Sequence, residues 1–303
     1  MSSHKVAGGG RAGFSPWAWL AFLAACGFVA AALTVSPPTG GTSAPAAVVV
    51  DQQASTDEVA AQSSGGAARP LANDCSGGTV HFTFDDGPNV HTPLLLDRLA
   101  ALHLKATFFV MGERVAGREQ IIRREVAEGH SVQNHSYRHF NLVTGTDLAG
   151  VGRTPWGASQ IEFELIMDNR VITAAGAPTP TQYRPPYGSV NLEVDKIATK
   201  LGLRLIMPWS DHDDMLFDDS HDTEAGVTAD VVARNVLEGL HPNSIITMHD
   251  GEQAATLHST AALQPIVDAM NERHMCASTE LPADSTGGVF SAPGRGGSSG
   301  HPE

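Results

Sequence analysis

The chain has 303 residues, of which 42% are hydrophobic and 17% are charged, a composition typical of soluble globular proteins. The formal net charge of -14 argues against nucleic acids and anionic wall polymers as substrates recognised by their charge. A neutral polymer or a small molecule is a better match, as a substrate, for a chain with this negative net charge.

The first predicted element is an export or anchoring segment. Residues 1–16 carry Lys5 and Arg11 among Gly and Ser, and residues 17–35 contain no charge. This pattern is typical of a signal peptide or of an N-terminal membrane anchor. A lipobox ending at Cys26 is a third interpretation, which the apolar run beyond that cysteine disfavours. All three export the rest of the chain, either secreted or anchored to the outer face of the membrane.

Two low-complexity segments flank a single predicted domain. Residues 36–73 and 283–303 are rich in small and polar residues, so they have little to bury and are expected to be a disordered linker and a disordered tail. Residues 74–282 have the length of one domain. Cys75 and Cys276 lie at its two ends, and two leftover thiols in an exported protein usually pair, which predicts a disulfide.

Short apolar runs alternate with helical stretches along the predicted domain. The predicted strands are residues 80–84, 106–110, 131–134, 181–184, 203–207, 244–248 and, more weakly, 275–278. The predicted helices are residues 93–102, 119–128, 159–175, 192–201, 229–240 and 260–273. This alternation indicates an α/β fold with parallel strands, and it leaves two architectures open, a barrel and an open doubly wound sheet.

Polar clusters follow the C-terminal ends of the predicted strands. They are Asp85 with Asp86, His135 with His139, "RPPYG" at 184–188, "WSDHDD" at 209–214 and "HDG" at 249–251. In parallel α/β folds, ligands bind at this edge of the sheet, and in barrels the catalytic groups come from several strand ends. We therefore expect these clusters to meet on one rim.

The candidate metal ligands are His135, His139 and an aspartate. If "HSYRH" is helical, its two imidazoles are four residues apart and face one side, where they can bind a single ion. Two histidines and one aspartate leave positions on Zn²⁺ for water and substrate, as in catalytic sites. The plainer interpretation is that both histidines are solvated or packed, as we expect for most of the chain's 14 histidines.

The adjacent aspartates in "TFDDGP" need an explanation, because neighbouring carboxylates repel each other. Within a strand they would face opposite sides of the sheet. At the strand's end, the turn at Gly87-Pro88 lets both reach the rim, where one can bind a metal and the other can accept a proton. The alternative is an Asp-Gly-Pro turn that only caps the next helix.

With these residues the chain resembles the polysaccharide deacetylases of carbohydrate esterase family four, the NodB-homology domain. "TFDDGP", "HSYRH" and "RPPYG" match the family's first three motifs in order, and "MHDG" matches the core of the fifth. The resemblance covers about residues 78–278. It implies a distorted (β/α) barrel, here as a single catalytic domain, and metal-dependent removal of N-acetyl or O-acetyl groups from carbohydrate.

The resemblance also implies a role for each residue of the metal centre. Asp86, His135 and His139 resemble the metal-binding triad, and Asp85 resembles the catalytic base that takes a proton from the attacking water. Arg184 would orient Asp85 through charge-assisted hydrogen bonds. The expected cofactor is Zn²⁺, although such ligands also accept Co²⁺, Mn²⁺ or Ni²⁺.

Further roles follow from the same resemblance. The backbone N–H of Tyr187 would bind the oxyanion, with Pro186 and Trp209 beside it on the substrate side. His249 resembles the general acid that protonates the leaving amine or alcohol. Asp214 is the best match for the aspartate that tunes His249.

The fourth motif departs from the family pattern. In "WSDHDDML", His212 stands between acidic residues, and Met215 stands where a second Trp is expected. Asp211 and Asp213 therefore compete with Asp214 for its role. These departures cast doubt on the catalytic efficiency or on the preference for acetyl groups more than they cast doubt on metal binding.

Two other positions leave alternatives open. Thr247 stands where a Leu normally lines the acetyl-methyl pocket of the family, which makes the pocket more polar. Trp156 lies in an irregular, Gly-rich stretch after the second motif, and it is either a sugar-stacking platform or a packed loop residue.

The resulting hypothesis is an exported deacetylase whose partner is a carbohydrate polymer or oligomer, with membrane contact only through the N-terminal segment. Peptidoglycan, chitooligosaccharide and acetylxylan all suit such an enzyme. Two other function classes remain open. One is a wall-carbohydrate-binding or scaffold protein with a decayed catalytic rim, and the other is a hydrolase of a different amide or ester.

Overall fold

A computed structural model describes residues 68–147, 150, 152, 155–207, 217–218 and 227–282. The predicted export segment, most of the linker and the tail lie outside the described residues, as do Trp209, Asp214 and the neighbouring acidic residues of the fourth motif. Among the residues that are described, no helix combines the length and the apolar composition needed to cross a bilayer.

Strands and helices alternate along the described part of the chain. The strands are β1 (Thr79–Asp85), β2 (Ala106–Val110), β3 (Ser131–Asn134), β4 (Gln182–Tyr183), β5 (Arg204–Leu205), β6 (Phe217–Asp218), β7 (Ile245–His249) and β8 (Cys276–Ala277). The helices are α2 (Thr92–Ala101), α3 (Gly112–Val115), α4 (Glu119–Ala127), α5 (Ala158–Ala175), the 3-10 turn η1 (Pro186–Gly188), α6 (Leu192–Lys200), α7 (Ala229–Gly239) and α8 (Gln253–Glu272).

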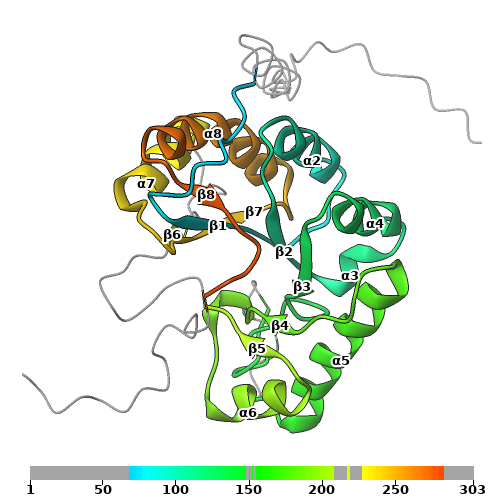
Figure 1. The fold of residues 1–303 in the computed structure, drawn as a ribbon. Helices are drawn as coiled ribbons and strands as arrows, with labels where there is room; N and C mark the ends of the chain where they lie inside the picture. Colours follow the sequence, from blue (N-terminus) through cyan, green and yellow to red (C-terminus); the bar gives the residue numbers. More distant parts are fainter. Residues whose placement is uncertain are drawn as a thin grey trace, which may run out of the picture. The chain divides into compact units, whose positions relative to one another are not determined.

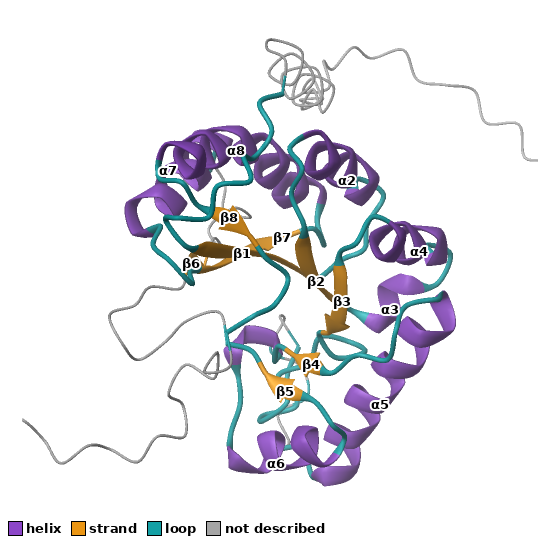
Figure 2. Cartoon of the chain, in the orientation of Figure 1, coloured by secondary structure: helices purple, strands orange, loops and turns teal. Residues whose placement is uncertain are grey.

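The strands form one parallel sheet in the order β5-β4-β3-β2-β1-β7-β6, and β8 pairs with the start of β1. Figures 1 and 2 show the strands as an inner arc with the helices around its outer side. A doubly wound sheet would carry helices on both faces. The arrangement is therefore a half-barrel of parallel strands, and the expected distorted (β/α) barrel is confirmed.

The core lies between the strands and the outer helices. β1 and β2 are buried along nearly their whole length, as expected for parallel strands covered by helices. Phe84 and Phe108 stack at a centroid distance of 5.3 Å, and Leu95 and Leu99 of α2 are fully buried in the same cluster. This core holds the C-terminal ends of β1 and β2 in register, and those ends carry the candidate site.

Several element boundaries differ from the sequence-based prediction. The short helix α3 was not predicted, because four residues are too few for a periodic signal. Helix α8 begins at Gln253 rather than at residue 260, and its first turns bury Ala255 and Leu257. Residues 68–73, expected to end the linker, lie on the domain instead, and Leu71 joins the core.

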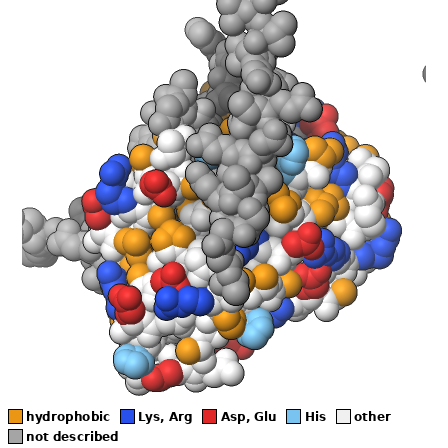
Figure 3. Space-filling model, turned by 90° about the horizontal axis from the view of Figure 1, so that it is seen from above, with side chains coloured by type: hydrophobic (Ala, Val, Ile, Leu, Met, Phe, Trp, Pro, Cys, Tyr) orange, Lys and Arg blue, Asp and Glu red, His pale blue; other side chains and the backbone are white. Residues whose placement is uncertain are grey.

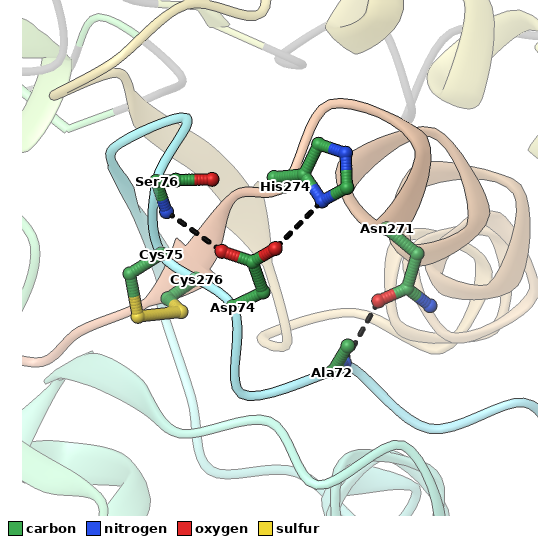
Figure 4. The surroundings of a disulfide bond; sticks show 7 residues. All are labelled: Ala72, Asp74, Cys75, Ser76, Asn271, His274 and Cys276. Carbon is green, nitrogen blue, oxygen red and sulfur yellow. Dashed lines mark hydrogen bonds and ion pairs between the residues drawn. A yellow bond between two sulfur atoms is a disulfide. The ribbon is translucent and has the colours of Figure 1, made fainter.

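The two ends of the domain are joined covalently. Cys75 and Cys276 form the predicted disulfide, which links residues 201 positions apart in the sequence. Figure 4 shows its surroundings, in which Asp74 accepts a hydrogen bond from the Ser76 N–H and pairs with His274 at 2.8 Å.

On the face seen in Figure 3, basic side chains lie close to acidic ones.

Candidate active site

The two aspartates of "TFDDGP" lie at the C-terminal end of β1. Asp85 is the last residue of the strand, and its register partners are Phe109 of β2 and His249 of β7. Asp86 follows with φ 71°, a left-handed conformation that is uncommon for a residue other than glycine. This turn ends the alternation of the strand, so both carboxylates reach the same rim.

Two glycines allow the chain to pass closely at this turn. A Cβ on Gly87 would lie 2.2 Å from the carboxylate oxygens of Asp250, and one on Gly251 would lie 2.2 Å from the Cβ of Asp86. Neither position has room for a side chain. The "DDGP" and "HDG" segments, far apart in the sequence, therefore form one tightly packed unit beneath the site.

Asp86, His135 and His139 converge on one point. Asp86 Oδ1 lies 3.2 Å from His135 Nε2 and 3.0 Å from His139 Nε2, and the three candidate ligand atoms all lie within 4.8 Å of one another. Burial raises the pKa of Asp86, but the two imidazoles lower it more, so the net pKa lies well below the ordinary value. The carboxylate is therefore ionised.

The second nitrogen of each imidazole indicates how the site is prepared for a metal. His135 Nδ1 lies 2.8 Å from the backbone carbonyl of Arg184, which can only accept, so Nδ1 carries the proton. His139 Nδ1 lies 3.1 Å from the Tyr187 hydroxyl. Both Nε2 atoms lie on the side of Asp86 Oδ1, where the three atoms could bind one divalent cation. The outer hydrogen bond of His135 is of the kind typical of metal-binding histidines.

The two histidines lie in a loop, so the helical geometry considered for "HSYRH" does not occur. Residues 135–139 form an irregular loop after β3, and Ser136 and His139 have positive φ angles of 64° and 60°. The imidazoles still meet, with ring centroids 5.0 Å apart, because the loop folds back on itself. The four-residue spacing drew attention to these two histidines, which do lie together, although not through the helical geometry considered for it.

Arg184 links the candidate base to the metal centre. Its Nη1 donates hydrogen bonds of 2.8 Å to Asp85 Oδ1 and to the Thr83 hydroxyl, and its backbone carbonyl is the acceptor for His135. Arg184 is 1% exposed and Asp85 is 4% exposed. The guanidinium also lies over the ring of Phe109, 4.3 Å from its centroid. The carboxylate of Asp85 is thus held in one orientation.

The remaining predicted residues of the described chain lie on the same rim. Tyr187 and Pro186 belong to η1, which follows β4, and the ring of Tyr187 contacts His139 at a centroid distance of 4.7 Å. His249 ends β7 directly beside Asp85 in the register. Thr247, two residues earlier on the same face, is 2% exposed. The ring centroid of Trp156 lies 5.2 Å from that of Phe140, and Trp156 packs against a cluster of buried residues that includes Leu142 and Leu165, which favours the packed-residue interpretation.

Asp250 is a polar residue of the site that the sequence analysis did not assign. Burial raises its pKa to about 7, which the hydrogen bond from the Thr92 hydroxyl, 2.7 Å long, only partly offsets. Its backbone N–H donates to the carbonyl of Asp85 at 3.0 Å. The signal was present in "MHDG", where Asp250 directly follows His249 at the end of a strand.

The sequence is similar to known carbohydrate deacetylases. Residues 72–206 match the family described as polysaccharide deacetylase. A bifunctional xylanase/xylan deacetylase from Cellvibrio japonicus is 34% identical over 67% of this chain and 27% of the relative. A chitooligosaccharide deacetylase from Sinorhizobium fredii is 35% identical over 64% of this chain and 86% of the relative. A peptidoglycan-N-acetylglucosamine deacetylase from Bacillus cereus is 31% identical over 64% of each.

The fold is similar to solved structures as well. A family 4 carbohydrate esterase from Streptomyces lividans, solved in complex with acetate, superposes with a TM-score of 0.56 at 29% identity. The match covers 67% of this chain and 93% of the esterase. The similar region thus spans nearly all of that esterase and of the Sinorhizobium relative, but about a quarter of the Cellvibrio protein.

Proposed function

This chain belongs to the polysaccharide deacetylase family, and we propose that it is a metal-dependent deacetylase of an extracellular carbohydrate. Its reaction would hydrolyse N-acetyl or O-acetyl groups of peptidoglycan, chitooligosaccharide or acetylxylan. The observation that carries the proposal is the convergence of Asp86, His135 and His139 beside the Arg184–Asp85 pair. Acetate, present in the Streptomyces lividans structure, is the product that such an enzyme releases.

In this proposal each residue of the rim has one task. Asp85, oriented by Arg184, accepts a proton from the water that attacks the acetyl carbonyl. The backbone N–H of Tyr187, with Pro186 beside it, donates to the resulting oxyanion. His249 gives a proton to the departing amine or alcohol, and acetate leaves.

A bound metal would supply the remaining chemistry. Asp86, His135 and His139 would hold Zn²⁺, Co²⁺, Mn²⁺ or Ni²⁺, which would supply Lewis-acid polarisation in the site. Two histidines and one carboxylate form an open ligand set, which leaves room for substrate. Trp209 and Asp214 keep their proposed roles at the substrate and behind His249.

We place the protein outside the cytoplasm, secreted or anchored through residues 1–35. The Cys75–Cys276 disulfide supports this location, because such bonds persist in oxidising compartments. A polar linker between an anchor and the domain suits a substrate of the cell wall. The formal net charge of -14 agrees with a neutral carbohydrate partner rather than a nucleic acid.

A second candidate function rests on the fourth motif. Its His212 and Met215 depart from the family pattern, which favours a wall-carbohydrate-binding protein with an impaired catalytic rim. Such a protein would bind the metal or the glycan without releasing acetate. A hydrolase of another amide or ester is the third candidate, and it would release a different acid.

Acetate release from the three substrates, with chelator and with added Zn²⁺, tests the proposal. We expect release from at least one substrate, loss of activity after chelation and recovery with zinc. The variant Asp85→Asn is the negative control for contaminating esterases. Stoichiometric zinc with no acetate from any substrate would favour the binding protein instead, and a chain that takes up no zinc would contradict the proposal.

A further inference from the structure

Helix α5 places two buried carboxylates against the loop that carries both histidines. Glu164 and Asp168 are one helical turn apart, so they share a face of the helix, and both are 0% exposed. Carboxylates are rarely buried completely unless they have partners. Both oxygens of Glu164 and Oδ2 of Asp168 accept hydrogen bonds from the loop from His135 to His139.

Asp168 holds the start of this loop. Its Oδ2 accepts a hydrogen bond of 3.0 Å from the backbone N–H of His135. Just before it, the side-chain amide of Asn134 donates to the carbonyl of Leu165 and to the side chain of Asn169, at 2.9 and 2.7 Å. The last residue of β3 and the first metal ligand are thus both attached to α5.

Glu164 holds the end of the loop. Its Oε2 accepts from the backbone N–H of Arg138 at 2.8 Å, and its Oε1 lies 2.7 Å from both Nε and Nη2 of the Arg138 side chain. Hydrogen bonds between an ionised arginine and a carboxylate are stronger than bonds between neutral groups. Arg138 directly precedes His139, so this attachment restrains the second histidine ligand.

An aromatic group restrains the same guanidinium from the outside. The Arg138 guanidinium carbon lies 5.1 Å from the ring centroid of Phe140, 5.3 Å from that of Phe163 and 6.0 Å from that of Trp156. Cation–π contacts of this kind orient the arginine side chain. Arg138 is therefore held by a buried carboxylate and by aromatic rings, although its side chain is 40% exposed.

The loop needs such restraints because its backbone is unfavourable. Ser136 and His139 occupy the left-handed region, a strained conformation for residues other than glycine that persists only where the surroundings impose it. Residues 135–139 form neither a helix nor a strand. Besides α5, the loop is held by the carbonyl of Val110, which also accepts from the His135 N–H, and by the N–H groups of Gly112 and Glu113, which donate to its backbone carbonyls. If the loop relaxed, the two Nε2 atoms would separate from Asp86.

We propose that Glu164 and Asp168 are positioning residues that set the separation of His135 and His139 and thereby the affinity of the site for its metal. This inference rests on the proposed function, because it concerns the same metal centre. A positioning role differs from a merely stabilising role in one measurable respect. A stabilising residue changes the melting temperature, whereas a positioning residue also changes the metal dissociation constant of the folded chain.

The test compares Glu164→Gln with Glu162→Gln. Glu162 lies on the same helix, where its side chain is 36% exposed and lies 3.3 Å from that of Lys200. The zinc dissociation constant of each variant is measured by competition with a chromophoric chelator, well below its melting temperature. We expect Glu164→Gln to bind zinc about 10–100-fold more weakly than the parent, and Glu162→Gln to match the parent within about twofold.

A second variant and a second readout keep the test decisive. Arg138→Lys preserves the charge but not the fork, so it should weaken zinc binding in the same direction, and it replaces Glu164→Gln if that variant does not fold. Amide hydrogen exchange of the zinc-free chain should become faster at residues 135–139 in both variants and stay unchanged in Glu162→Gln.

The outcomes separate this inference from the proposed function. If the parent binds zinc and both Glu164→Gln and Arg138→Lys bind it within about twofold of the parent, the positioning role is overturned and the proposed function stands. The positioning role is likewise overturned if only the melting temperatures of these variants fall. If the parent itself takes up no zinc, the proposed function and this inference are overturned together.

Discussion

The two ends of strand β1 are built for different purposes. Its C-terminal end carries Asp85, Asp86 in a left-handed conformation and a buried arginine, within reach of two histidines. Its N-terminal end pairs with β8 next to the Cys75–Cys276 disulfide, whose neighbours in Figure 4 are ordinary polar side chains. In (β/α) barrels, the C-terminal face carries the chemistry and the opposite face carries stability.

The contrast also indicates where the stability comes from. The Arg184–Asp85 pair is almost completely buried, and removing two charges from water offsets much of their attraction. Such a pair is therefore weak evidence for stability, and the left-handed backbone of Asp86 lowers stability. The aromatic and aliphatic core and the disulfide have to compensate for the catalytic rim. Changes at the two ends of β1 should therefore separate activity from stability.

The largest effect is expected at the metal centre. His135→Ala removes one of three ligands, so zinc content and acetate release should both be lost, since the remaining two ligands are a weak site. Elemental analysis and an acetate assay measure the two losses. The control is His274→Asn at the opposite end, where Asn tolerates the positive φ of 55°, and it should keep both properties. Full zinc occupancy in His135→Ala would contradict the ligand assignment.

The next effect separates the base from the metal ligands. Asp85→Asn keeps the shape and an acceptor for Arg184 but cannot take a proton, so turnover should fall about 10²–10⁴-fold while zinc remains bound. Steady-state kinetics with zinc quantification on the same sample measures both. A near-parental rate in the zinc-loaded variant would show that another group is the base.

The opposite end of β1 should show the reverse behaviour. The double variant Cys75→Ser/Cys276→Ser opens a loop that spans 201 positions, which should lower the free energy of unfolding by about 2–5 kcal/mol. Turnover at 25 °C should stay within about twofold of the parent. Denaturant unfolding and the acetate assay measure the two quantities. If both thiols of the parent are freely alkylated without reductant, the disulfide is wrong.

A smaller and pH-dependent effect is expected at His130, just before β3 on the stable side. Its Nδ1 accepts the Ala106 N–H at 3.1 Å, and burial, reinforced by the charges of Lys105 and Arg124, lowers its pKa from 6.5 to about 4. Glu128 lies 3.9 Å away, but its charge does not offset the burial.

The sign follows from proton binding. Between pH 6.5 and 4 the unfolded chain binds a proton at His130 that the folded chain excludes, so stability falls as the pH drops. The contribution is about 3 kcal/mol across this window. His130→Gln keeps a hydrogen-bond acceptor but cannot bind this proton. Between pH 7 and 4, its free energy of unfolding should therefore fall by about 3 kcal/mol less than that of the parent, as measured by denaturant unfolding. Equal losses in both chains would mean that His130 is already protonated in the folded state.

Local patterns in the sequence determined the main features of this protein. The β-branched and aromatic runs at 80–84 and 106–110 identified β1 and β2, because strands covered by helices in a parallel sheet are rich in such residues. The motifs "TFDDGP", "HSYRH" and "RPPYG" pointed to the family, and the strand-end rule brought their residues to one rim. The pairing of Cys75 with Cys276 needed only their number and their position at the edges of the domain.

The tertiary structure alone decided how these residues are held. His135 and His139 meet through a loop rather than a helix, and the carboxylates that restrain this loop come from α5, about 30 positions later in the sequence. Asp250 lies against Gly87 although the two residues are far apart in the sequence. Local patterns report on the conformation that neighbouring residues favour, whereas the shape of an irregular loop is imposed by contacts between distant segments. Such contacts exist only once the half-barrel has formed.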